Sequence, residues 1–208
     1  MDLSRQADLV KRQERWPIKI IGVGAIGSNA ANILGRMGFM LNLIDPQNVQ
    51  EENLAPGMLK KGNMPKVQSV KQLLIQQGVP ASNIMTEQRL ADGGDIGKGI
   101  VIVGVDSMEA RRELWYTRTS TPDLYIDTRI GWKIVTVFAV ENVDKDIESY
   151  ENSLMGEPEE LPCGSKATAY TGALAGAHAA AIAAQFVQGL KYPKFVYIDV
   201  ETGQYTAL

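Results

Sequence analysis

Hydrophobic positions along the chain follow two alternating patterns. Residues 18–23, 40–44 and 100–105 are short apolar runs that end at glycine or a polar residue, which is typical of buried parallel strands. Between these runs, apolar residues recur every three or four positions, as in 26–37 and 67–74, and this spacing predicts helices. Strands that alternate with helices predict a doubly wound, mostly parallel sheet of the α/β class.

The pattern changes toward the C-terminus. The apolar runs 124–126 and 134–140 have no helical segment between them, so we predict that these strands are antiparallel. Two further apolar runs, 195–200 and 204–207, flank a short polar turn and predict a terminal hairpin. The predicted fold is therefore a Rossmann-like doubly wound sheet with antiparallel strands toward the C-terminus, in a single domain spanning residues 1–208.

Three segments do not read as strands. The first 15 residues are polar and predict an amphipathic helix. Residues 141–166 begin with a dense run of acidic side chains, which we interpret as a mobile crossover loop. Residues 167–190 are rich in Ala and Gly, and predict one helix, or two, that another element can approach closely.

Composition excludes several classes of protein. The 208 residues are 45% hydrophobic and 22% charged, and the net charge of -3 argues against a duplex nucleic-acid binder. No apolar run approaches the roughly 18–20 residues of a membrane span, and the N-terminus does not resemble a signal peptide. A chain with one cysteine fits the reducing cytosol, so we expect a cytoplasmic protein. The single cysteine, Cys163, and single histidine, His178, exclude an intrachain disulfide and a four-ligand Cys/His zinc site. We expect His178 to be a structural helix residue.

A glycine-rich turn follows the first predicted strand. Gly22, Gly24 and Gly27 form a G-x-G-x-x-G pattern, and the predicted helix begins near Ala25. The first glycine permits a tight turn, the second lets a phosphate approach the backbone, and the third lets the helix pack on the strand. Asp45 follows about 20 residues later, at the end of the next strand, where its carboxylate can bind ribose hydroxyls. The turn therefore predicts a nucleotide site, without saying which nucleotide.

The rest of the chain distinguishes between nucleotides. Asp45 is the first residue of the segment D-P-Q-N-V-Q-E-E-N-L. Lys66 lies at the start of a predicted helix, in the segment M-P-K-V. Asp106 follows a predicted strand, in the segment G-V-D-S-M-E-A-R. In this order and spacing the sequence resembles the ubiquitin-like-protein-activating family, which includes the ThiF and MoeB adenylyltransferases. The resemblance covers nearly the whole chain, and it is the combination of motifs that is specific.

The resemblance implies an adenylyltransferase that uses ATP and Mg²⁺. The substrate would be the C-terminal carboxylate of a ubiquitin-like or sulfur-carrier protein or peptide. In this reaction Lys66 would neutralise charge on the phosphates, and Asp106 would hold Mg²⁺. Asp45 would bind the ribose. Asn53 would either bind the nucleotide or order the loop in which it lies. The Ala/Gly-rich helix suits close packing between two copies of the chain, and isologous dimers are the commonest assembly, so we expect a homodimer. From the charge and the apolar runs we expect no nucleic-acid or membrane partner.

Several of these residues have structural alternatives. Lys66 would otherwise be a solvated lysine, and Asp106 a helix cap. Arg111, on the helix that follows, is better explained by local pairing. Cys163 resembles a family cysteine that takes the activated acyl group, but lone cysteines also serve as inert small hydrophobes.

The chain also departs from the family pattern. After Asn53-Leu54 the family has an arginine that contacts the leaving phosphates, whereas this chain has Ala55-Pro56-Gly57. Lys60 or Lys61 can supply a charge there but not the bidentate fork of arginine. The second aspartate of the D-x-D motif is Gln47, and the C-x-x-C pairs that bind structural zinc are missing, so no zinc is expected. Arg5-Gln6 resembles an arm that reaches into the partner's site.

Two other functions remain open. A degenerate family member would bind nucleotide or a partner without catalysis, which the missing loop arginine favours. An NAD-dependent oxidoreductase would use the same glycine turn and Asp45, although the sequence offers no plausible hydride-transfer cluster.

Overall fold

A single eight-stranded sheet forms the centre of the molecule. The computed structural model describes residues 2–6, 16–156 and 167–208, and the strand order is β3-β2-β1-β4-β5-β6-β7-β8. In chain order the strands are β1 Ile18–Ile21, β2 Leu41–Ile44, β3 Ile84–Glu87, β4 Ile100–Val103, β5 Leu124–Gly131, β6 Ile134–Val140, β7 Phe195–Asp199 and β8 Gln204–Ala207. The five strands β3, β2, β1, β4 and β5 are parallel, and β6, β7 and β8 continue the sheet antiparallel. The predicted α/β class, Rossmann-like topology and antiparallel C-terminal strands are confirmed.

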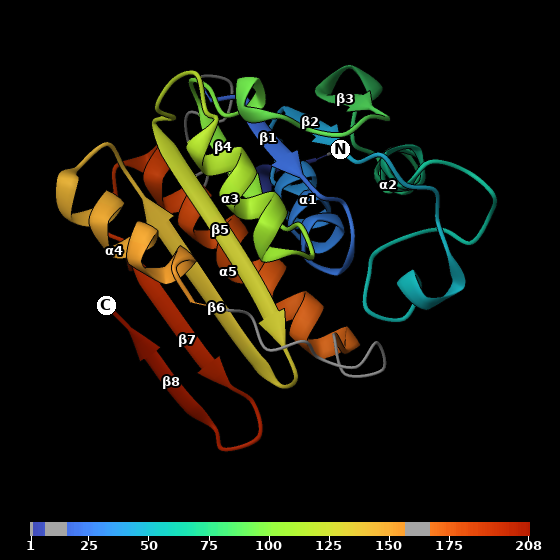
Figure 1. Ribbon diagram of the computed structural model, residues 1–208. Helices are drawn as coiled ribbons and strands as arrows, with labels where there is room; N and C mark the ends of the chain where they lie inside the picture. Colours follow the sequence, from blue (N-terminus) through green and yellow to red (C-terminus); the bar gives the residue numbers. More distant parts are fainter. Residues whose placement is uncertain (1, 7–15, 157–166) are drawn as a thin grey trace.

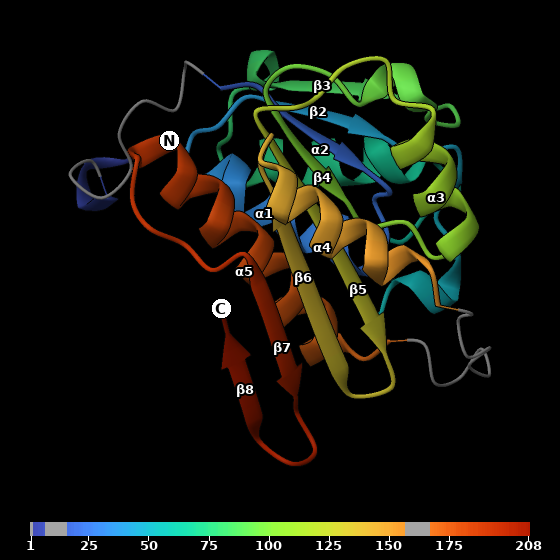
Figure 2. The same ribbon diagram turned by 60° about the vertical axis from the view of Figure 1, so that its left-hand side comes forward.

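Helices cover both faces of the sheet (Figures 1 and 2). They are α1 Ala25–Arg36, α2 Lys66–Gln76, α3 Met108–Tyr116, α4 Asp144–Leu154 and α5 Ala169–Gln188. One face packs on α1, α2 and α5 through a large apolar cluster, and the opposite face packs on α3 and α4 through a smaller cluster. No helix in the described part of the chain is long and apolar enough to cross a membrane.

The helix α5 packs closely on α1 because its glycines leave no side chain between them. A Cβ atom on Gly176 would lie 2.6 Å from Asn29 Cβ, and one on Gly172 would lie 2.4 Å from the carbonyl oxygen of Pro56. The Ala/Gly-rich segment is therefore one continuous helix that crosses α1 at close range, as its small side chains predict.

The interpretation of residues 141–166 as a loop is wrong for much of that segment. Residues Asp144–Leu154 form α4, whose outer face carries the acidic side chains. Tyr150 and Leu154 are buried against α3 and β5, and Ile147 packs beside them. The spacing of these three residues is helical, so burial of one face holds the helix although the segment is acidic. Residues 157–166 lie outside the described chain.

The predictions for the two ends of the chain are tested to different extents. The terminal hairpin is confirmed as β7 and β8, which pair in antiparallel register. Of the predicted N-terminal helix, the structure describes only a short 3₁₀ turn, Ser4–Gln6, since residues 7–15 lie outside the described chain.

Candidate functional site

The glycine turn joins β1 to α1 at the carboxyl edge of the parallel strands. Gly22 has φ +83°, a conformation that favours glycine, and a Cβ there would lie 2.9 Å from the Gly104 carbonyl group. A Cβ on Gly27 would lie 2.0 Å from the Gly22 carbonyl oxygen. Gly24 differs, because a Cβ there would meet no atom within 4 Å. Two glycines thus serve turn and packing, while Gly24 faces open space where a phosphate can approach the first turn of α1.

Asp45 ties the glycine turn to the end of β2. Its Oδ2 accepts a hydrogen bond from Val23 N at 2.7 Å, and its Oδ1 accepts one from Gln47 N at 2.8 Å. The residue is only 6% exposed. Each carboxylate oxygen can accept a second hydrogen bond, so Asp45 shapes the turn and keeps capacity for a ligand hydroxyl.

Lys66 is buried beside Asp45 at the start of α2. Because the residue is only 5% exposed, the alternative that Lys66 is a solvated lysine is wrong. Its Nζ donates to Gln47 Oε1 at 2.6 Å, and no carboxylate of residues 2–6, 16–156 or 167–208 lies within salt-bridge distance. A buried ammonium group is costly unless an anion neutralises it. This lysine is therefore poised to receive an anionic ligand.

The long loop after β2 is pinned over the first turn of α1. Met58 N donates to Ser28 Oγ at 2.9 Å, and Asn29 Nδ2 donates to the Pro56 carbonyl at 3.1 Å. Asn53 caps the short 3₁₀ helix Glu51–Asn53, since its Oδ1 accepts from Gln50 N at 3.3 Å. In this structure Asn53 thus orders its own loop, one of the two roles expected of it.

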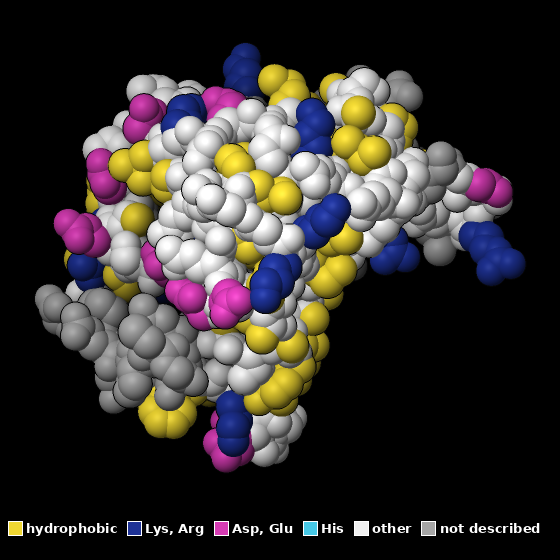
Figure 3. Space-filling view, turned by 90° about the vertical axis from the view of Figure 1, so that its right-hand side faces the viewer, with side chains coloured by type: hydrophobic (Ala, Val, Ile, Leu, Met, Phe, Trp, Pro, Cys, Tyr) yellow, Lys and Arg dark blue, Asp and Glu magenta, His cyan; other side chains and the backbone are white. Residues whose placement is uncertain are grey.

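The two lysines of this loop differ in their partners. Lys61 Nζ forms an exposed ion pair with Glu51 at 3.0 Å, on the rim of a hollow of about 240 Å³. The backbone N–H of Lys60 donates to Ser69 Oγ of α2 at 2.6 Å, and its side chain is exposed. Figure 3 faces this side of the molecule, where Lys and Arg side chains are scattered and form no single basic patch.

Asp106 follows β4 at the same edge and is exposed. The cap of α3 is Ser107, whose Oγ accepts from Ala110 N at 3.1 Å, so the alternative of Asp106 as the cap is wrong. An exposed carboxylate that is free of the helix cap fits Mg²⁺, which takes one or two carboxylates and completes its shell with phosphate oxygens and water. Within the described residues, no group of three or more His, Cys, Asp or Glu side chains forms a metal site.

Arg111 belongs to a buried ionic cluster, as the structural explanation predicts. Its guanidinium donates to Asp127 and to the Val105 and Thr128 carbonyls. The other Asp127 oxygen accepts from Arg129 Nε at 2.8 Å and from the Tyr150 hydroxyl at 3.1 Å. Burial lowers the pKa of Arg111 to about 10, which leaves it charged at neutral pH. This cluster locks α3, β5 and α4 together.

Asp127 was not predicted from the sequence. It lies in the middle of an apolar strand and follows no motif, and only its pairing with Arg111 and Arg129 gives it a role. The available signal was a carboxylate that directly follows a run of buried apolar residues, because a buried carboxylate is almost always paired.

The remaining candidate residues lie apart from this edge. Cys163 lies outside the described residues. His178 is half-buried on α5, where its ring lies 5.9 Å from that of Tyr205, and burial lowers its pKa. Gln6 Nε2 donates to the Arg36 carbonyl at 2.8 Å, so Arg5-Gln6 lies at the far end of α1 from the glycine turn, within this chain.

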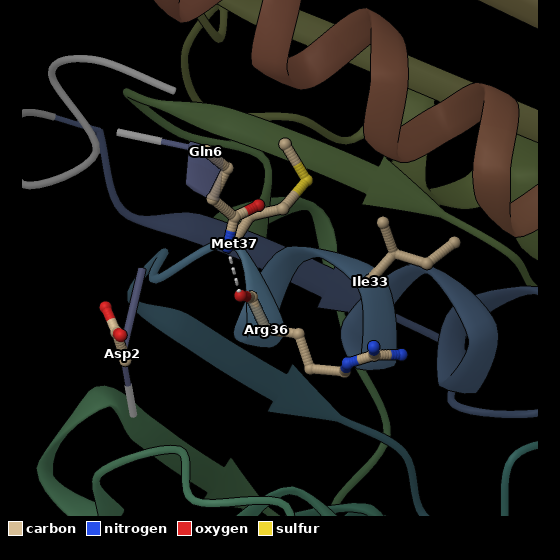
Figure 4. A pocket seen from close by; sticks show the side chains of 5 residues that line it. All are labelled: Asp2, Gln6, Ile33, Arg36 and Met37. Atoms are coloured by element: carbon tan, nitrogen blue, oxygen red, sulfur yellow. Dashed lines mark hydrogen bonds between the residues drawn. The ribbon is translucent and has the colours of Figure 1, made fainter. Parts of the chain in front are cut away.

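The N-terminal segment and the end of α1 line a hollow of about 350 Å³ (Figure 4). Its lining residues are Asp2, Gln6, Ile33, Arg36 and Met37. It opens at the opposite end of α1 from Gly24, Asp45 and Lys66, so it is separate from the candidate nucleotide site.

Solved structures with this fold were found at low sequence identity. The crystal structure of E. coli MccB with ATP matches with a TM-score of 0.68 at 17% identity, covering 94% of this chain and 64% of MccB. MccB with AMPCPP and MccA matches with a TM-score of 0.69 at 16% identity, with the same coverage. PaaA matches with a TM-score of 0.72 at 14% identity, covering 100% of this chain and 68% of PaaA. These likenesses confirm the fold.

The chain spans just under two thirds of the MccB chains that it matches. No curated protein matches the chain. The family model of the ThiF family matches residues 4–206, nearly the whole sequence. The chain therefore belongs to the ThiF family.

Proposed function

We propose that this protein binds ATP with Mg²⁺ and adenylates the C-terminal carboxylate of a peptide or small carrier protein. Membership of the ThiF family supports this activity, and so do the structural neighbours solved with ATP and with the peptide partner MccA. The observation that carries the proposal is the buried cation Lys66. Its ammonium group contacts the neutral side chain of Gln47, two residues after Asp45, which binds the glycine turn.

The site residues divide the work of the reaction. The open face of Gly24 and the first turn of α1 receive phosphate oxygens through backbone N–H groups, and Lys66 neutralises their charge. Asp45 orients the ribose. In adenylation a carboxylate oxygen attacks the α-phosphorus and pyrophosphate leaves, so these residues act by holding two anions in line.

Asp106 is the residue that would hold Mg²⁺. The ion would neutralise phosphate charge that Lys66 alone cannot balance, in a loop that lacks the arginine of the family pattern. Lys60, exposed and without an ion pair in the described chain, is the better placed of the two loop lysines to add a second charge.

We also propose a homodimer. The exposed face of α5 supports it, because Ala169, Ala173, Ala177 and Ala181 form an exposed stripe on a helix that has no charged residue between positions 167 and 190. Isologous dimers are the commonest assembly of soluble proteins. We also propose that Cys163 accepts the activated acyl group, on the resemblance of its position to that of the family cysteine.

The test is calorimetric titration with ATP and with NAD, with and without Mg²⁺, followed by pyrophosphate exchange. We expect Mg²⁺-dependent binding of ATP, no response to NAD, and loss of exchange in Asp106→Ala while circular dichroism stays unchanged. NAD binding would favour the oxidoreductase. ATP binding without exchange, with any peptide tail, would favour the degenerate family member.

A further inference from the structure

Gln47 links two residues of the candidate nucleotide site that come from different segments of the chain. Its backbone N–H donates to Asp45 Oδ1 at 2.8 Å, and its carbonyl accepts from Lys66 N at 3.0 Å. Its side-chain Oε1 accepts from Lys66 Nζ at 2.6 Å. Asp45 in turn accepts from Val23 N, in the glycine turn. Gln47 therefore connects the carboxylate proposed for the ribose to the lysine proposed for the phosphates.

The contact with Lys66 determines which end of the Gln47 amide stays available. An ammonium group only donates hydrogen bonds, so it faces the amide oxygen and not the amide nitrogen. The nitrogen Nε2 carries two N–H donors, and within residues 2–6, 16–156 and 167–208 neither has a hydrogen-bond partner. Because Gln47 is exposed, these two donors are accessible to a ligand.

Lys66 is buried where Gln47 is exposed. It is 5% exposed, and no carboxylate of the described residues lies within salt-bridge distance of its Nζ. A buried ammonium group favours an anionic ligand that neutralises it. Because Gln47 contacts Nζ and is itself exposed, an anion that reaches Nζ from the solvent also reaches the Gln47 amide.

The amide also separates this chain from the family pattern, which has the second aspartate of D-x-D at this position. A carboxylate beside Lys66 would neutralise the ammonium group and repel a phosphate, because it offers acceptors only. The amide instead satisfies one ammonium N–H, leaves the charge of Lys66 for the ligand, and adds two donors of its own. The exchange makes the site more positive by one charge.

We propose that Gln47 binds a phosphate group of the nucleotide together with Lys66, and that it sets the preference of this site for polyphosphate ligands. The proposal rests on the proposed function, which brings a phosphate to Lys66. Hydrogen bonds from a neutral amide to a phosphate are charge-assisted and stronger than those between neutral groups. The amide thus supplies part of the anion binding that the missing loop arginine would otherwise provide.

The test uses two substitutions of Gln47 and one matched control. Gln47→Glu keeps the size of the side chain and an acceptor for Lys66, but it removes both N–H donors and adds a negative charge. Gln47→Met removes the amide without adding charge. Gln50→Glu is the control, because it adds the same charge to an exposed position of the same loop. Calorimetry measures the affinity of each protein for Mg-ATP and for adenosine.

We expect Gln47→Glu to bind Mg-ATP at least about tenfold more weakly and adenosine within about twofold of the wild type, since only ATP brings phosphates. Gln47→Met should weaken Mg-ATP about three- to tenfold, because it loses the donors and gains no repulsion. Gln50→Glu should leave both affinities unchanged. Unchanged affinity for Mg-ATP in Gln47→Glu would overturn the proposal. Equal weakening of ATP and adenosine would also overturn it, because Gln47 would then only order the site.

Inorganic triphosphate separates this proposal from the proposed function. A ligand that binds the folded state raises the free energy of unfolding, so urea denaturation with and without triphosphate reports on the anion site alone. We expect triphosphate to stabilise the wild type and to stabilise Gln47→Glu less. That result without pyrophosphate exchange would keep the anion site and reject adenylation. Pyrophosphate exchange by the wild type, with equal stabilisation of the two proteins by triphosphate, would reject the role of Gln47 alone.

Discussion

Two regions at the carboxyl edge of the sheet each bury positive charge, but they differ in whether a carboxylate neutralises that charge. In the cluster beneath α4, Arg111 and Arg129 both contact Asp127, and Tyr150 completes its hydrogen bonds. At the start of α2, the ammonium group of Lys66 contacts the neutral amide of Gln47, and no carboxylate of the described residues lies within salt-bridge distance of it. A charge that the fold has already neutralised holds elements together, whereas a buried charge without a counterion favours a ligand that brings one.

The largest expected effect is the loss of Asp127. Asp127→Asn keeps the volume but leaves two guanidinium groups without a carboxylate, and breaking a buried pair costs about 3–5 kcal/mol. We therefore expect the free energy of unfolding, measured by urea denaturation, to fall by about that amount. The control is Glu51→Gln at the exposed Lys61 pair, which should cost at most about 1 kcal/mol. Equal losses in the two variants would contradict a special role for the cluster.

The next largest effect is expected for Lys66→Met, which should lower the affinity for ATP without lowering the free energy of unfolding. Lys66→Met removes a buried charge that no carboxylate in the described part of the chain neutralises, so the unliganded protein should be as stable as the wild type or slightly more stable. Its affinity for Mg-ATP should fall about 10–100-fold, because a charge-assisted contact to phosphate is worth about 1.5–3 kcal/mol. Lys61→Met is the matched control, with little expected change in either quantity. A large loss of stability in Lys66→Met would make the lysine a structural residue.

The smallest expected effect is the loss of ATP affinity in Gly24→Ala, which we compare with the loss of stability in Gly27→Ala. Gly24→Ala adds a methyl group to open space, so unfolding should change by no more than about 1 kcal/mol, while Mg-ATP binding weakens about tenfold because the methyl group meets the phosphate. Gly27→Ala places a methyl group 2.0 Å from the Gly22 carbonyl oxygen and should destabilise the fold itself. If Gly24→Ala leaves ATP affinity unchanged, phosphate does not approach that position.

The parallel half of the fold was predictable because its signals are local. The apolar runs, the glycine turn, Asp45 and the helix at Lys66 each follow from a few neighbouring residues. The helix α4 was missed because its acidic residues dominate the local composition. The helical spacing of Ile147, Tyr150 and Leu154 is the only local sign of this helix, and three residues over two turns are a weak pattern beside so many carboxylates.

Pairings between distant residues were beyond the sequence. Nothing local joins Arg111 to Asp127, or sets the length of β5 against that of β4. The burial of Lys66 also depends on Gln47, 19 positions away, and on how the long loop returns to α2. These features arise from strand register and loop closure, which no short motif encodes.

The contact between α1 and α5 has a consequence for motion. Because Gly172 and Gly176 place the two helix backbones against each other with no room for a side chain, α5 cannot slide or rotate without moving the turn that begins at Gly24. The antiparallel half of the sheet, which α5 covers, is therefore mechanically coupled to the glycine turn. A hinge between the two halves is therefore disfavoured, and the two halves are expected to move as one body.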